Sequence, residues 1–116
     1  MNQEWPREEI NPYRLFHFAQ VPLWLLSQRE ITAGAKLLYG RLITFAGKDG
    51  RAYPTQRTLG NELGVSDRQI RYLVAELVEH RLIEAKRRDF AGPDHYLFLR
   101  HPWMDLSPAT TWEQPN

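Results

Sequence analysis

The stretch TQRTLGNELGVSDRQIRYLVAELVEH, which starts at Thr55, restricts the fold of this chain more than any other. Thr55 is a hydroxyl N-cap for a helix over residues 56–63, and Gly64 suits the left-handed conformation that commonly ends a helix. Ser66 stands three residues before Gln69, which is the Ser-x-x-Gln form of a capping box. The stretch therefore predicts two helices joined by a tight turn.

The second predicted helix, which spans residues 66–80 with its cap, has an apolar and a polar face. Its apolar residues recur at helical spacing: Ile70, Leu73, Val74, Leu77 and Val78. Its polar face carries two arginines, Arg68 and Arg71. A helix-turn-helix whose second helix is polar and bears arginines is the arrangement that places a helix in the major groove of DNA.

Length and composition narrow the class of protein. The chain has 116 residues, the size of one domain, and 42% of them are hydrophobic, as in globular proteins. It contains no cysteine, which excludes disulfides, thiolate catalysis and cysteine-ligated zinc and suits a reducing cytosol. No apolar run approaches the roughly 20 residues of a membrane span, and no signal sequence follows Met1. We therefore expect a soluble, cytoplasmic protein with no membrane partner.

Positive charge is concentrated in one part of the chain. Residues 31–100 carry twelve basic and eight acidic side chains, whereas the whole chain has a net charge of only +1. The excess therefore lies on the part that is predicted to fold. This distribution fits either a nucleic-acid-binding surface or an ordinary solvated surface.

The elements before the helix-turn-helix are predicted as follows. Residues 1–12 are polar and contain two prolines, so they form a flexible lead-in. Residues 13–21 are aromatic and apolar with partial alternation, which predicts a short strand ended by Pro22. Pro22 also suits the first position of a helical turn. The apolar residues after it are expected in the core: Trp24, Leu25 and Leu26.

Thr32 is the start signal of a helix over residues 33–45, whose apolar residues cover a wide arc. This pattern predicts the buried first helix of a three-helix bundle. Gly40 inside this helix costs about 1 kcal/mol relative to alanine, and a close helix crossing is the simplest reason to keep it. Residues 47–50, Gly-Lys-Asp-Gly, predict the turn that follows.

Two strands are predicted after the helix-turn-helix, over residues 81–88 and 95–99, with a turn at residues 90–94. A β-hairpin in this place is a wing. The tail, residues 101–116, contains three prolines and is predicted to be irregular. Its apolar residues are expected to fold back on the core or to bind a partner: Trp103, Met104 and Trp112.

Five short motifs follow one another along the chain: Val21-Pro22, Thr32–Lys36, Pro54-Thr55, Leu59–Ser66 and Leu82-Ile83. Together they resemble the winged-helix domain of plasmid and phage replication initiators and of related bacterial helix-turn-helix proteins. Two positions depart from that pattern: Gly60 stands where alanine is commoner, and Arg81 stands where glycine is common. The resemblance implies an α+β, mainly α, winged helix-turn-helix domain over residues 13–100. It consists of a three-helix bundle, a short N-terminal strand and a C-terminal hairpin wing.

The polar face of the second helix supplies the candidate contacts to DNA bases: Arg68, Gln69, Arg71 and Tyr72. Each arginine can donate two hydrogen bonds to O6 and N7 of guanine. The glutamine can bind adenine, and the tyrosine can contact a phosphate or a thymine methyl group. The alternative is that the two arginines are solvated helix charges, paired with Asp67 or Glu76.

Seven further residues are candidate phosphate contacts: Thr55, Gln56, Arg57, Ser66, Lys86, Arg87 and Arg88. The first four lie at predicted helix N-termini, where exposed amides favour a phosphate and where the two hydroxyls also act as caps. The last three lie on the rising edge of the wing, residues 82–99, where they would contact phosphates or the minor groove. The alternative for the wing is a charged hairpin that prevents edge pairing.

No constellation of catalytic residues stands out. The four histidines are scattered without the spacing of metal ligands: His17, His80, His95 and His101. Residues 47–50 contain two glycines but lack the Lys-Ser/Thr that completes a phosphate-binding loop. We therefore expect no enzymatic activity, and no cofactor, metal or small-molecule substrate.

The leading hypothesis is a sequence-specific protein for double-stranded DNA, acting in plasmid- or phage-type replication initiation or in transcription regulation. It would be located with the nucleoid or a plasmid. The alternative is a winged-helix module that binds a protein partner and does not recognise DNA. Helix-turn-helix proteins commonly bind paired half-sites, so a homodimer is also expected, although no long coiled-coil helix is predicted.

Overall fold

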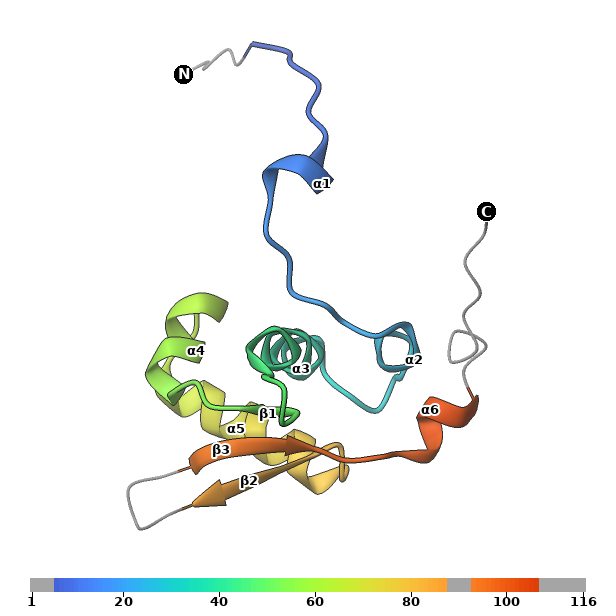
Figure 1. Ribbon diagram of the computed structural model, residues 1–116, viewed down its shortest axis with the longest axis vertical. Helices are drawn as coiled ribbons and strands as arrows, with labels where there is room; N and C mark the ends of the chain where they lie inside the picture. The colour runs from blue at the N-terminus through green and yellow to red at the C-terminus, as the bar shows by residue number, and fades with distance from the viewer. Residues whose placement is uncertain (1–5, 88–92, 107–116) are drawn as a thin grey trace.

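The computed structural model describes residues 6–87 and 93–106, and within them a mainly helical fold with one small sheet (Figure 1). The elements are α1 (Pro12–Leu15), α2 (Leu23–Leu26), α3 (Ala33–Phe45), β1 (Arg51–Ala52), α4 (Gln56–Leu63), α5 (Asp67–Glu79), β2 (Ile83–Arg87), β3 (Pro93–Phe98) and α6 (Pro102–Leu106). Helices α3, α4 and α5 pack together, and the antiparallel sheet, in the order β1-β3-β2, lies against them. This is the predicted winged helix-turn-helix.

One hydrophobic core joins the three main helices to the sheet. Its fully buried large side chains come from α2 to α5 and from both strands of the hairpin: Leu25, Leu38, Leu42, Leu59, Ile70, Leu77, Leu82, Ile83 and Tyr96. Among the described residues, no polar or charged residue other than tyrosine is buried with them. The predicted bounds of α3, α4 and α5 are confirmed, because their caps and apolar spacing are local signals.

The predicted N-terminal strand over residues 13–21 is wrong. Asn11 accepts a hydrogen bond from the backbone of Tyr13 at 3.1 Å and starts the short helix α1 instead. The third strand of the sheet is β1, whose Ala52 faces Tyr96 of β3. Since β1 and β2 occupy both edges of β3, the sheet offers no place beside β3 for the N-terminal segment.

The segments flanking the domain differ in part from prediction. Helix α2 is confirmed, with Leu25 buried and Trp24 packed edge-on against Tyr39 at 5.7 Å, but Leu26 is exposed. The tail is not wholly irregular, because Pro102 begins α6. Trp103 of α6 packs against the core as expected. Trp112 lies outside the described residues, as do Trp5, Arg88 and most of the predicted wing turn.

Gly40 allows a close contact of α3 with residues 20 and 21, and not the helix crossing that was expected. A Cβ atom at this position would lie 2.6 Å from Cγ2 of Val21 and 3.0 Å from the carbonyl oxygen of Gln20. The backbone amide of Gln20 also donates to the carbonyl of Gly40 at 3.1 Å. The glycine therefore allows an extended segment, and not another helix, to lie directly on α3.

Helix α5 ends in a motif that usually contains glycine. Arg81 has a φ of 62°, in the left-handed region. The amide of Arg81 donates to the carbonyl of Val78 at 2.9 Å, and that of Leu82 donates to Leu77 at 3.0 Å. These two bonds form a Schellman motif, which explains why glycine is common here in the proteins that the chain resembles.

We expect Arg81→Gly to raise the free energy of unfolding by about 0.5–1 kcal/mol, because glycine removes a Cβ that is unfavourable in this conformation. This gain is net of an opposing effect, since glycine also increases the freedom of the unfolded chain. Urea unfolding followed by circular dichroism would measure the change. Arg81→Ala is the matched control because it removes the same charge but keeps the Cβ. An equal gain in both variants would contradict the conformational explanation.

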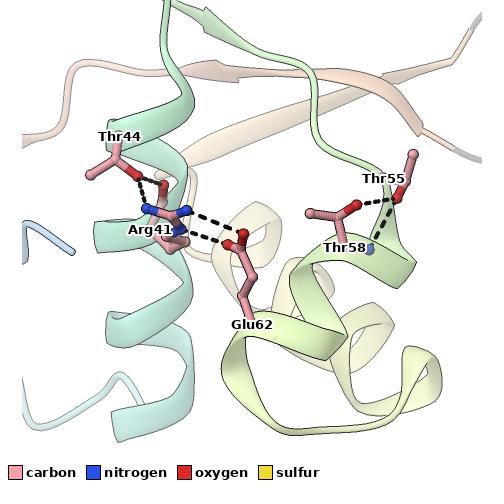
Figure 2. A network of polar contacts seen from close by, with 5 residues as sticks. All are labelled: Arg41, Thr44, Thr55, Thr58 and Glu62. Carbon is pink, nitrogen blue, oxygen red and sulfur yellow. Dashed lines mark hydrogen bonds and ion pairs between the residues drawn. The ribbon is translucent and has the colours of Figure 1, made fainter. Parts of the chain in front are cut away.

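An ion pair connects α3 to α4 (Figure 2). Nε of Arg41 lies 2.6 Å from Oε1 of Glu62, and a second bond of 3.2 Å joins the other carboxylate oxygen. The guanidinium also donates to Oγ1 of Thr44 at 2.9 Å and lies 4.6 Å from the ring centre of Phe45. The hydrogen bond from Arg41 lowers the pKa of Glu62 and raises that of Arg41.

This pair makes stability depend on pH. Because the pKa of Glu62 is lowered in the folded state, the pair stabilises the fold at pH values above the ordinary value of 4.5 and loses its effect as the pH falls through the folded-state pKa. We expect Glu62→Gln to lower the melting temperature at pH 7, and the difference from wild type to shrink as the pH falls below 4.5. Glu79→Gln, on the exposed surface of α5, is the control. A constant difference at all pH values would contradict this assignment.

Candidate nucleic-acid interface

The two helices of the motif are held by the caps that the sequence predicts. Oγ1 of Thr55 accepts a hydrogen bond from the amide of Thr58 at 3.0 Å (Figure 2), and Oγ of Ser66 accepts one from the amide of Gln69 at 3.0 Å. Gly64 has a φ of 74° and ends α4. The turn between the helices is therefore defined by Gly64 at the end of α4 and by Ser66 at the start of α5.

The turn passes very close to α4. A Cβ atom at Gly60 would lie 2.8 Å from the carbonyl oxygen of Val65, and the amide of Val65 donates to the carbonyl of Gly60 at 2.9 Å. Since the nearest atom belongs to the backbone, an alanine here would require the turn to move. The glycine that departs from the common pattern is therefore explained by the tightness of this turn.

The outer face of α5 presents all the candidate base contacts to solvent. Ile70, Leu73, Val74 and Leu77 are buried, as predicted, whereas Val78 is exposed at the edge of the apolar face. The four candidates are exposed: Arg68, Gln69, Arg71 and Tyr72. Nε of Arg68 donates to the hydroxyl of Tyr72 at 3.1 Å, and its guanidinium lies 5.5 Å from the tyrosine ring centre.

Among the described residues, the positive charges of the two arginines of α5 are not neutralised. Under the alternative of solvated helix charges, Glu76 is one possible partner, but its carboxylate accepts hydrogen bonds from the amide and hydroxyl of Thr32, both at 2.7 Å. In the described part of the chain, no carboxylate forms an ion pair with Arg68 or Arg71. Glu76 instead fixes the middle of α5 to the start of α3.

The candidate phosphate contacts at the helix N-termini differ in accessibility. Thr55, Arg57 and Ser66 are exposed, whereas Gln56 is half-buried beside Tyr96. The hydroxyl of Tyr96 is buried and has no hydrogen-bond partner in good geometry among the described residues. Burial raises the pKa of Tyr96, and the nearby Gln56 side chain opposes this rise. The side chain of Gln56 therefore lies beside the buried hydroxyl of Tyr96 and is only partly accessible to a phosphate.

The described part of the wing carries two of its three basic candidates. Lys86 and Arg87 are exposed on β2, and Nζ of Lys86 lies 3.4 Å from Glu84. The pairing is irregular here: Lys86 faces His95, but Arg87 faces Pro93. Because of this shift in register, Lys86 and Arg87 do not follow the regular alternation of side chains between the two faces of the sheet.

Tyr53 is an exposed aromatic residue beside the wing that the sequence did not single out. Its ring centre lies 5.3 Å from that of His95 on β3, and its hydroxyl donates to Asp49 at 2.9 Å. Hydrogen bonds from the amide of Arg51 and from Tyr53 lower the pKa of Asp49, while that of Tyr53 is raised. The position of this aromatic residue directly before Pro54-Thr55 is the feature of the sequence that could have indicated it as a candidate.

The described residues form no metal-binding cluster and no membrane-spanning helix. Over residues 6–87 and 93–106, no three histidine or acidic residues gather as metal ligands would. In the same part of the chain, no helix has the length and apolar character needed to span a membrane. The exposed polar face of α5 and the adjoining hairpin therefore form the candidate site.

The packed helices, the tight capped turn and the hairpin together define a winged helix-turn-helix domain. Residues 29–83, just under half of the chain, match the sequence model of a family described as helix-turn-helix domain. A search of curated proteins gives no significant match.

Two solved structures are similar to the chain over most of their length. One is described as the N-terminal domain of a DNA binding protein; it is 19% identical, with a TM-score of 0.55, over 86% of this chain and 85% of that one. The other is described as a Rep-DNA complex; it is 20% identical, with a TM-score of 0.54, over 87% of each chain. At these identities the likeness establishes the fold.

Proposed function

We propose that this protein binds double-stranded DNA in a sequence-specific manner, with α5 in the major groove. The observation that carries the proposal is the pair of exposed arginines, Arg68 and Arg71, without carboxylate partners among the described residues. A guanidinium can donate two parallel hydrogen bonds to guanine, and an unpaired one loses no ion pair when it does so. Gln69 and Tyr72 lie on the same face and would make the neighbouring base contacts.

Backbone contacts would come from both sides of α5. Thr55, Arg57 and Ser66 lie at the N-termini of α4 and α5, where amide groups carry partial positive charge. Gln56 is the fourth candidate there. Lys86, Arg87 and Arg88 would place positive charge from the wing on the flanking phosphates. Such contacts position the protein without selecting a sequence.

We further propose a role in replication initiation, with transcription regulation as the second candidate role. The sequence motifs resemble those of replication initiators, and one neighbour with the same fold is described as a Rep-DNA complex. The two candidate roles would share the same contact surface and differ in which DNA sites are bound.

The test is selection of bound duplexes from a random pool, followed by binding of a selected duplex at several salt concentrations. Four cationic backbone contacts, from Arg57 and the three wing residues, would give a slope of about −4 in a plot of log affinity against log salt concentration. A slope near zero, or the absence of binding at low salt, would contradict the proposal. A pool that yields no preferred sequence would contradict base-specific recognition.

A further inference from the structure

The N-terminal arm, residues 6–20, carries an apolar surface that no other described part of the chain covers. Every residue of the arm is exposed, and Figure 1 shows the arm leaving the body of the domain beside α3. Five of its side chains are large and apolar, and between 47% and 85% of each is exposed: Ile10, Tyr13, Leu15, Phe16 and Phe18. In a domain with a well-formed core, an apolar surface of this kind indicates an interaction site.

The arm has local order of its own. Asn11 caps α1, and the rings of Tyr13 and Phe18 lie 5.8 Å apart on either side of the helix end. The base of the arm is fixed by the bond between Gln20 and Gly40 and by the contact of Val21 with the same glycine. The apolar side chains are thus presented on a shaped segment with a fixed origin.

A cavity of about 520 Å³ opens at the base of the arm. Its lining includes Phe18 and Ala19 of the arm, Leu37 and Arg41 of α3, and Glu62 and Leu63 of α4. The two charged residues of the lining neutralise each other in the ion pair of Figure 2, and Leu37 is 53% exposed. The cavity is therefore suited to apolar side chains.

The arm of the same chain is poorly placed to fill this cavity. Helix α1 ends at Leu15, and His17 already lines the cavity. Phe16 between them has an extended backbone, with φ −115° and ψ 149°, which directs α1 away from the body. To enter its own cavity, α1 would have to reverse direction at this single residue. An arm that arrives from another molecule has no such constraint.

We propose that two copies of this chain exchange their N-terminal arms, each inserting the apolar side chains of α1 and its flanks into the cavity of the other. Arm and cavity belong to the same sequence, so a two-fold arrangement would make both contacts at once. A buried Phe or Tyr side chain accounts for about 200 Å², so the three aromatic rings of one arm still expose about 370 Å². Two arms and the surfaces that they cover would bury on the order of 1,500 Å², which is the size of a stable interface.

The experiment measures mass in solution by light scattering or sedimentation, on the full chain and without DNA. The wild-type protein is expected at twice the monomer mass of 13.7 kDa. A double substitution in the arm, Leu15→Glu with Phe16→Glu, and a substitution in the cavity, Leu37→Glu, should each raise the dissociation constant of the dimer by about tenfold or more. All three positions are exposed, so thermal unfolding should remain cooperative. Val78→Glu, an exposed apolar position on α5, is the matched control and should remain dimeric.

Mixing the two defective chains gives the decisive measurement. The arm variant keeps an intact cavity and the cavity variant keeps an intact arm, so one complete contact can form between unlike chains. A heterodimer in the mixture, with each variant alone monomeric, supports exchange of the arms. A monomeric wild type, dimers unaffected by either substitution, or a mixture that stays monomeric would each overturn it. None of these outcomes depends on DNA, so the proposed function is tested separately.

Discussion

Replacement of Arg68 and Arg71 by alanine is expected to remove most of the preference of this protein for its target sequence. Each arginine bound to a guanine contributes about 1–3 kcal/mol of discrimination, which corresponds to a factor of about five to 150 for each. The measurement is the ratio of affinities for a selected duplex and a scrambled duplex at one salt concentration.

The structure gives a physical reason to expect this size of effect. Neither arginine has a carboxylate partner among the described residues, so in the free protein their charges are available. Tyr72 accepts a hydrogen bond from Arg68 and restricts its guanidinium, which reduces the entropy lost on binding. Both effects favour contacts that are strong and directional.

Arg100→Ala is the matched control for this experiment. Arg100 lies between β3 and α6 and pairs with Asp105 of α6. Figure 1 shows α6 beyond the C-terminal end of β3, on the opposite side of the domain from α4. Its removal takes away one positive charge without touching α5. We expect the control to keep the ratio of affinities. An unchanged ratio in the Arg68 and Arg71 variants would contradict base contact by these residues.

Ile70→Ala is expected to lower the free energy of unfolding by about 2–5 kcal/mol. Ile70 lies on the inner face of α5 and is completely buried. Its Cγ1 would lie 3.6 Å from a Cβ at Gly60, so it packs between α5 and this part of α4. Truncation would leave a cavity that these helices cannot close, because the tight turn already sets their distance.

Guanidinium unfolding followed by circular dichroism would measure this loss. Small domains have about 5–15 kcal/mol of stability in total, so the expected loss is a large fraction of the stability and should be clear in the unfolding midpoint. Val78→Ala on the same helix is the control, because Val78 is exposed and its truncation leaves no cavity. Equal losses in both variants would contradict the assignment to core packing, because alanine is the better helix former at both positions and would by itself favour α5.

The helices of this domain could be predicted almost to the residue from local signals. Thr32, Thr55 and Ser66 each accept a hydrogen bond from an amide three residues later. Such caps, together with apolar residues spaced three and four apart, act within one turn of helix. No knowledge of distant residues is needed to place them. The candidate base contacts followed from the same pattern, since the polar face of α5 is the complement of its buried face, and their role in DNA binding stays a prediction.

The strands were less predictable because strand formation requires an available partner. Residues 13–21 have the composition of a strand, yet they form α1 and an exposed arm. Residues Arg51–Ala52 have no strand pattern of their own, yet they pair with β3. The free edge of β3 lies beside the end of α3, where the chain turns at Gly50, so the nearer segment occupies it.

The sequence by itself determined the capped helices, the tight turn and the hairpin, because each depends on residues that are neighbours along the chain. Only the tertiary structure decided which charges remain free and which surfaces remain open. Glu76 is bound by Thr32, which is 44 residues away, and this contact leaves the arginines of α5 without that carboxylate. The cavity likewise brings together the base of the arm, α3 and α4. Contacts of this kind depend on how the helices pack, and a periodic pattern within one helix carries no record of them.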